Sequence, residues 1–350
     1  MSAPPDNSVD AERPAPKPAV VSSFLQIAKR PELGAVGGLL VVTLFFLFTA
    51  DPAMFTAAGL MNWMSPAAQL GILAVGAALL MIAGEFDLSI GSMVAFAGFV
   101  FGAILIVWQA PLSVAILLTL AFAISIGALN AHIVLKTGLP SFIVTLALLF
   151  ILRGLSLVGL KWATGGSTQL RGIRESVADS WLLPLFSGDV SGIPVELLWF
   201  AAVAAVGAFV LARTRFGNWI LASGGDAEAA RKSGVPVADV KATLFIVMAC
   251  CAALVGILTV LDSGSTDARR GFQKEFEAII AAVIGGCLLT GGFGSVVGAF
   301  FGSIIFGMVV IGLTYTRIDL DWYQVFLGAM LLIAVLFNNF VRKRVAGERS

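Results

Sequence analysis

Residues 67–108 read AAQLGILAVGAALLMIAGEFDLSIGSMVAFAGFVFGAILIVW, with two long apolar runs on either side of a short polar segment. Each run, 67–84 and 90–108, is long enough for a helix that crosses a bilayer, which takes about 17–25 residues. Of the 350 residues, 59% are hydrophobic and only 12% are charged. Soluble domains carry about a quarter charged residues, so this composition indicates an integral membrane protein.

Apolar runs of this length recur along the whole chain and predict ten transmembrane helices. They are expected near 34–50, 67–84, 90–108, 112–130, 140–160, 195–212, 242–261, 276–291, 295–313 and 322–340. The expected fold is therefore all-α, a polytopic integral membrane protein of about ten transmembrane helices with glycine-broken hairpins. Gly84–Ser92 and Gly286–Ser295 are faintly similar, because each is a glycine-bounded break before a glycine-bearing helix, and this hints at related hairpins.

The chain ends are polar. Residues 1–31 are rich in proline, alanine and charge and predict a disordered cytoplasmic tail, and 342–350 predict a basic cytoplasmic tail. The transmembrane domain is expected over 32–341, with a cytoplasmic loop at 213–241. Lys29 and Arg30 before an apolar run could imitate a signal peptide, but the long polar leader favours an uncleaved first helix.

Basic residues predict the orientation, because they concentrate in cytoplasmic loops. If both tails are cytoplasmic, the outer segments hold seven basic residues: Lys161, Arg171, Arg174, Arg269, Arg270, Lys274 and Arg317. The inner segments then hold fourteen: Arg13, Lys17, Lys29, Arg30, Lys136, Arg213, Arg215, Arg231, Lys232, Lys241, Arg342, Lys343, Arg344 and Arg349. Both termini are therefore predicted to be cytoplasmic.

Several function classes are excluded by what the sequence contains. A formal net charge of +1 argues against a nucleic-acid partner. His132 is the only histidine, in a stretch that we interpret as a loop between helices, and Cys250, Cys251 and Cys287 lie in apolar runs. A zinc site or a histidine-based catalytic triad is therefore not expected. No G-x-x-x-x-G-K-[ST] motif occurs, so any ATP-driven work must come from another subunit.

Two polar features lie beside or within the apolar runs. Glu85 and Asp87 adjoin hydrocarbon, where carboxylates usually mark a pathway, although a turn in which Asp87 or Ser89 caps the next helix is an equal alternative. Arg153 lies inside the fifth run, where it either extends to the outer surface or lines the pathway. Apart from these charges, we expect only neutral polar groups inside the membrane, such as Asn62, Gln69, Asn130, Ser141, Thr145 and Thr290.

The loop at 213–241 contains the signals of a short helix outside the membrane. Asp226 is a good N-cap, Glu228 suits the first turn, Arg231 and Lys232 suit the last turn, and Gly234 is a natural stop. This helix is either a plain surface element or a docking element for a soluble partner.

Four stretches together resemble the ribose/galactose-type family of ABC importer permeases, over about Ala67–Asn339. They are EFDLSIGS (85–92), PSFIVTLALLFILRGL (140–155), FGNWILASGGDAEAARKSG (216–234) and AIIAAVIGGCLLTGGFGSVVGAFFG (278–302). The match departs at Glu85, where many members have a second glycine, and the segment Ser263–Lys274 looks particular to a subgroup. Both departures bear on the solute.

The resemblance implies a non-enzymatic permease subunit in a bacterial inner membrane, with no cofactor of its own. ATP and Mg²⁺ would be bound by two cytoplasmic ATPase subunits, a periplasmic binding protein would deliver a sugar, and a second permease copy would complete the channel. The implied pathway or gate includes Glu85, Asp87, Ser89, Ser92, Asn130, Arg153 and Thr290. The implied coupling element includes Gly225, Asp226, Glu228, Ala229, Ala230, Arg231, Ser233 and Gly234.

Other solutes and one other class of protein remain as alternatives. A related ABC permease for branched-chain amino acids, nucleosides or an autoinducer would share the architecture. A stand-alone channel or ion-coupled carrier is the alternative from a different class of protein. A neutral polyol fits the mostly neutral interior better than a charged solute does. Two carboxylates near one turn make a poor ion relay.

Overall fold

The computed structural model describes residues 31–346 and is built almost entirely of helices. The helices are α2 (Pro31–Thr49), α3 (Ala57–Ile82), α4 (Ile90–Ile106), α5 (Leu112–Thr137), α6 (Ser141–Thr164), α7 (Ile173–Ser176), α8 (Val195–Arg213), α9 (Arg215–Gly225), α10 (Ala227–Lys232), α11 (Val237–Ser263), α12 (Lys274–Ile284), α13 (Val296–Gly312) and α14 (Tyr323–Ala346). Short 3-10 turns cover Pro52–Phe55, Leu183–Leu185, Leu313–Tyr315 and Leu320–Trp322. The polytopic all-α prediction is confirmed.

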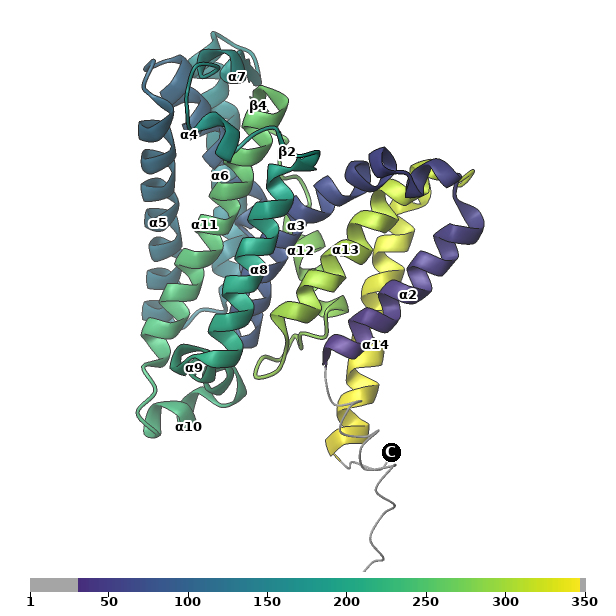
Figure 1. Cartoon of the computed structure of the whole chain (residues 1–350). Coiled ribbons are helices and arrows are strands. Elements are labelled where there is room, and N and C mark those ends of the chain that lie inside the picture. The colour runs from purple at the N-terminus through teal and green to yellow at the C-terminus, as the bar shows by residue number, and fades with distance from the viewer. Residues whose placement is uncertain (1–30, 347–350) are drawn as a thin grey trace, which may run out of the picture.

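Two pairs of short strands join the loops. Strand β1 (Gln169–Arg171) pairs antiparallel with β4 (Ser265–Asp267), with Leu170 opposite Thr266, and β2 (Asp189–Val190) pairs with β3 (Ile193–Pro194). The β1–β4 pair ties the loop after α6 to the loop after α11, which are distant in sequence. We call this side of the molecule the α7 end and the opposite side the α10 end (Figure 1).

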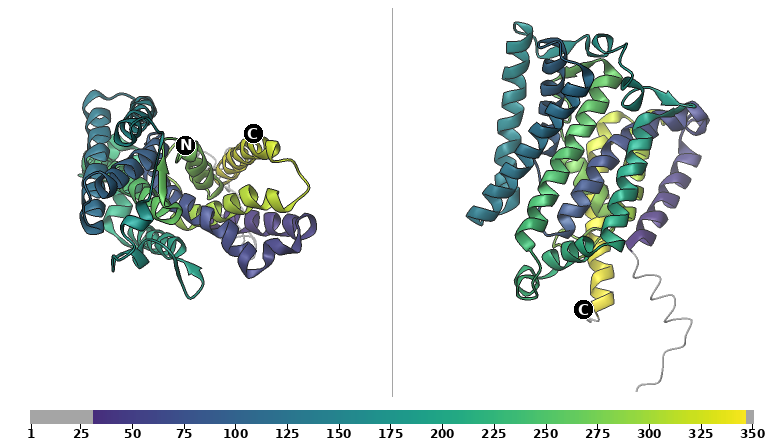
Figure 2. Two further views of the ribbon diagram at one scale, coloured as in Figure 1. Left: turned by 90° about the horizontal axis from the view of Figure 1, so that it is seen from above. Right: turned by 60° about the vertical axis from the view of Figure 1, so that its left-hand side comes forward.

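The long helices fall into two groups that share α3. Helices α4, α5, α6, α8 and α11 form one group, and α2, α13 and α14 form the other, as the views of Figure 1 and Figure 2 agree. In the most apolar 18-residue stretch of α3, 83% of the residues are buried, whereas in that of α2 only 11% are buried. Its apolar residues pack on both sides, and Gly307 of α13 lies against Ala67 of α3. The core is therefore centred on α3 and α11, and the outer helices expose apolar faces to lipid.

All ten predicted runs overlap helices, but three boundaries were wrong, two of them in α3 and α5. Helix α3 begins at Ala57, because Thr56 caps it by accepting from the Gly59 amide, and Pro66 lies inside it instead of before its start. Membrane helices tolerate internal proline when neighbouring helices surround it. Helix α5 continues to Thr137, so Asn130 and His132 lie within a helix, and the loop predicted around them was wrong.

The run predicted at 276–291 is not a full transmembrane helix. Helix α12 has 11 residues, which rise about 16 Å and cannot cross a layer of about 30 Å. Gly285 and Gly286 end it, because Cβ atoms there would collide with α13 or require a left-handed backbone. Among the described residues, seven other helices are long and apolar enough to span a membrane, while α4 and α14 are shorter apolar helices.

The predicted domain boundaries fall partly outside the described residues. The tail expected at 1–31 and the end of the tail expected at 342–350 lie there, while α14 continues past residue 341 to Ala346. Inside the loop at 213–241 the structure adds α9, which the sequence prediction lacked.

Candidate translocation and coupling sites

The segment between α3 and α4, Gly84–Ser89, is fixed by side chains of its neighbours. The amide of Phe86 donates to Ser141 Oγ and that of Leu88 donates to Thr145 Oγ1, both at 3.0 Å and both on α6. These α6 hydroxyls replace the hydrogen bonds that the broken helix cannot supply to its own backbone. We call this segment the α3–α4 break.

Asp87 and Ser89 form a buried polar chain within this break. Asp87 Oδ1 accepts from the amide and the hydroxyl of Ser89, at 2.8 and 2.6 Å, and Ser89 Oγ accepts from Asn130 Nδ2 of α5 at 3.1 Å. All three side chains are buried. Burial raises the pKa of Asp87 to about 6, and the hydrogen bonds from Ser89 oppose this rise. Of the predicted caps, Asp87 binds the Ser89 amide and Ser89 makes no cap of its own, and the pathway role of this turn stays a prediction.

The Glu85 side chain has a different partner from that of Asp87. Its carboxylate forms an ion pair with Lys241 Nζ at 2.5 Å, and both side chains are 13% exposed. Lys241 lies in the first turns of α11, directly after α10 along the chain. A recess of about 370 Å³ adjoins the pair and also contacts Arg231 of α10 and Gly138 after α5. Glu85 therefore connects the α3–α4 break to the loop at 213–241.

Arg153 points towards the protein interior. Its Nη2 lies 4.0 Å from Glu275 Oε1 of α12, and its guanidinium lies 5.0 Å from the ring centroid of Phe272. Arg153 is about 18 Å along α6 from its first residue, so α12 begins within the membrane layer. Arg153 therefore contacts the start of α12 and the loop before it, and both alternatives for this residue, the outer surface and the pathway, stay predictions.

The start of α12 carries charges that the sequence analysis missed. Glu275 and Glu277 are 2% and 6% exposed, and Glu277 forms an ion pair with Lys274 at 2.5 Å and accepts from Tyr323 Oη of α14 at 3.0 Å. The expectation of a neutral interior apart from Glu85, Asp87 and Arg153 was therefore wrong. A signal was present, since Glu277 lies inside the run predicted at 276–291. Buried ionisable groups in a membrane protein usually belong to a pathway.

The remaining predicted pathway residues are not all in one place. Ser92 is fully buried at the start of α4, and its hydroxyl has no hydrogen-bond partner among the described residues. Thr290 is exposed in the connection between α12 and α13. The structure thus groups Asp87, Ser89 and Asn130, sets Glu85 apart with Lys241, and brings Arg153 to Glu275.

Helix α10 has the ends that its sequence predicts. Asp226 Oδ1 accepts from the amides of Glu228 and Ala229 at 3.0 and 2.9 Å, and Gly234 has a left-handed backbone beyond the last turn. Glu228 and Lys232 form an exposed ion pair at 2.8 Å. The helix lies beside α9 at the α10 end in Figure 1.

The two alanines of α10 face opposite ways. Ala229 is exposed, whereas Ala230 is 6% exposed and packs inward. The resemblance implies both alanines in the coupling element, but only Ala229 lies on the free face, because residues one apart on a helix point in different directions. Gly225, Asp226, Glu228, Arg231, Ser233 and Gly234 are exposed with Ala229 and outline the free face of this helix.

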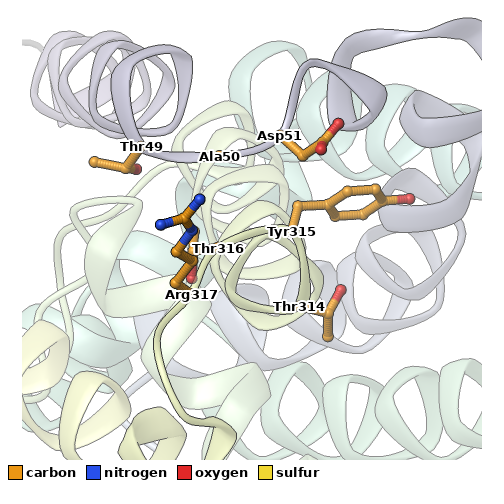
Figure 3. Close-up of a pocket in the computed structure, with 7 residues that line it drawn as sticks. All are labelled: Thr49, Ala50, Asp51, Thr314, Tyr315, Thr316 and Arg317. Atoms are coloured by element: carbon orange, nitrogen blue, oxygen red, sulfur yellow. The ribbon is translucent and has the colours of Figure 1, made fainter.

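A polar recess of about 530 Å³ lies at the α7 end, on the other side of the molecule. Its lining comes from the turn after α2 and the turn after α13, as Figure 3 shows: Thr49, Ala50, Asp51, Thr314, Tyr315, Thr316 and Arg317. The Asp51 amide donates to the Tyr315 carbonyl at 2.8 Å, and Asn62 Nδ2 donates to the Tyr315 hydroxyl at 3.0 Å, which joins the two turns.

A bundle of long apolar helices with one short helix, α12, packed among them is the architecture of a multi-pass integral membrane protein. Residues 59–335 match the family described as branched-chain amino acid transport system / permease component, and the chain belongs to this family. The resemblance to ABC importer permeases is confirmed by this match.

Individual relatives are similar over nearly their whole length. The xylose transport system permease protein XylH of Escherichia coli is 30% identical, over 88% of this chain and 92% of its own. The ribose import permease protein RbsC of Escherichia coli is 32% identical, over 86% and 91%. The xylose/arabinose import permease protein XylH of Sulfolobus acidocaldarius is 31% identical, over 92% and 88%.

Proposed function

We propose that this chain is the membrane-spanning subunit of an ATP-driven importer for a monosaccharide or a related polyol. The observation that carries this proposal is the full-length similarity to permeases of two organisms whose names specify xylose, ribose or arabinose. All of these solutes are neutral polyols. The chain itself provides transport and no ATP hydrolysis, in keeping with its family of permease components.

The partners follow from the family and from the two ends of the molecule. ATPase subunits bind at the α10 end, where an exposed, capped helix presents small and polar side chains. A solute-binding protein docks at the α7 end, and a second copy of this chain completes the pathway. Both termini are then cytoplasmic, because α2 begins and α14 ends on the side of the α10 end (Figure 1).

Solute uptake into proteoliposomes tests this function. The chain is reconstituted with its partner ATPase and solute-binding protein, and uptake of xylose, ribose, arabinose and leucine is compared. Accumulation of a pentose or hexose that requires internal ATP and the binding protein supports the proposal. Accumulation of leucine alone would favour the amino acid importer that the family description suggests. Uptake driven by an ion gradient without ATP would contradict an importer altogether.

A further inference from the structure

Three glycine-bearing segments meet at one point near the α10 end. They are the end of α3 with Gly84, the end of α9 with Gly224, and the connection between α12 and α13 with Gly291 and Gly292. The Gly292 amide donates to the Ile82 carbonyl at 2.8 Å. We call this meeting point of Gly84, Gly224, Gly291 and Gly292 the glycine junction.

The junction is a contact of backbone against backbone. A Cβ atom added to Gly224 would overlap the Ile82 carbonyl oxygen and lie 2.7 Å from the Gly292 nitrogen. One added to Gly291 would lie 2.8 Å from Gly84 Cα and 2.9 Å from the Gly224 carbonyl oxygen. Real Cβ atoms do not approach so closely, so each position excludes any side chain. The contact contains no rotatable side chain that could absorb a displacement.

The junction is directly connected to α10. Asp226 ends α9 and also caps the start of α10, so Gly224 lies two residues before the N-cap of the helix that we assign to the ATPase. On the far side of α10, Lys241 holds Glu85 of the same α3–α4 break. Both flanks of α10 thus contact that break, one through glycine backbone and the other through an ion pair.

We propose that the glycine junction transmits a displacement of α10 to both helix breaks of the membrane domain at once. Gly224 is the positioning residue of this device, because it contacts the α3–α4 break and the connection between α12 and α13 together. The two breaks border α4 and α12, which carry Ser92 and Glu275. This inference rests on the proposed coupling of α10 to an ATPase. It adds a defined route from that helix into the membrane.

The test measures solute taken up per ATP hydrolysed by the reconstituted complex. Gly224→Ala should lower this ratio by about tenfold, within the range of coupling free energies between distant sites. Co-purification with the ATPase should stay unchanged. Gly37→Ala is the matched control, since Gly37 is also helical and a Cβ there meets nothing within 4 Å. An unchanged ratio in Gly224→Ala would overturn the proposal.

A second measurement needs no variant and remains informative if Gly224→Ala does not fold. Hydrogen exchange of the wild-type complex is followed at the Gly292 amide, without nucleotide and with ATP trapped. A rigid junction predicts protection in both states, and rapid exchange in either state would contradict it. If wild type shows no ATP-driven uptake, the proposed function fails. If wild type is coupled and Gly224→Ala is equally coupled, only the junction fails.

Discussion

Glu85 and Lys241, which are 156 positions apart in the sequence, form an ion pair of 2.5 Å beside the recess that also contacts Arg231 of α10. Glu85 follows α3 and Lys241 lies near the start of α11, so the pair joins the α3–α4 break to the segment after α10. Each side chain is only 13% exposed. At this level of burial, an unpaired charge is costly.

Exchanging the two charges tests whether the pair supports transport. Glu85→Lys and Lys241→Glu alone place like charges together and should each lower uptake strongly. The double variant restores an opposite pair and should recover most of the uptake, because contacting residues are not additive. Glu85→Gln should also lower uptake while the protein still inserts. Equal loss in the double and single variants would contradict a role for this pair.

The buried carboxyl group of Asp87 should make the free energy of unfolding depend on pH. Burial raises its pKa from 3.8 to about 6, so the folded state favours the protonated form. The corresponding stability is fully present below pH 3.8 and is lost as the pH rises through 6. The loss is at most about 3 kcal/mol, at 1.36 kcal/mol per pKa unit.

Asp87→Asn is the matched variant, because its amide oxygen can accept the same two hydrogen bonds from Ser89. Thermal unfolding in detergent between pH 5 and pH 8 should show that wild type loses stability and that Asp87→Asn loses less. At pH 8 the variant should be the more stable protein, yet take up less solute. Parallel curves for the two proteins, with normal uptake, would assign Asp87 to an ordinary turn.

If Arg153 and Glu275 form a coupled pair, a second substitution should restore the stability that the first one removes. Arg153→Met leaves Glu275 buried without its cation and should destabilise the protein by about 3 kcal/mol. Adding Glu275→Gln removes the stranded charge, so the double variant should unfold closer to wild type than Arg153→Met does. Thermal unfolding in one detergent measures all three proteins. A double variant less stable than Arg153→Met would mean that the pair is not coupled.

The orientation is testable by cysteine labelling in intact cells, in a background where the three native cysteines are replaced by alanine. Ser176→Cys at the α7 end and Thr137→Cys at the α10 end are both exposed sites. Ser187 is a poorer choice, because it is buried and its hydroxyl donates to the Leu261 carbonyl. An impermeant reagent should label position 176 only. Labelling of position 137 only would reverse the topology.

The sequence predicted where the helices lie better than how they end. Apolar runs and caps such as Asp226 are local, so the positions of all ten runs and of α10 could be predicted. Pro66 and Asn130 were placed at helix boundaries because proline and a polar amide interrupt an apolar run in the sequence. In the structure, neighbouring helices provide the packing and the Ser89 partner that allow both inside helices.

The site was harder to predict because its partners are distant in sequence. Arg153 and Glu275 meet only through the fold, and Lys241 could not be linked to Glu85 without it. The half-helix α12 was predicted as a full crossing because Gly285 and Gly286 are compatible with a continuous membrane helix. The left-handed backbone of Gly286 and the close approach of Gly285 to α13 are visible only in three dimensions.

The proposed coupling of α10 to an ATPase can be tested with a bulky side chain on the free face of this helix. Ala229 is exposed, so Ala229→Trp should fold and insert normally at little cost in stability. Ala230→Trp is unsuitable, because Ala230 packs inward.

The decisive measurement is ATP-driven solute uptake by Ala229→Trp in proteoliposomes, together with its co-purification with the ATPase. We predict that uptake is lost and that the ATPase no longer co-purifies, while the amount of folded protein in the membrane equals that of wild type. Wild-type uptake with full retention of the ATPase would contradict the assignment of α10 as the coupling helix.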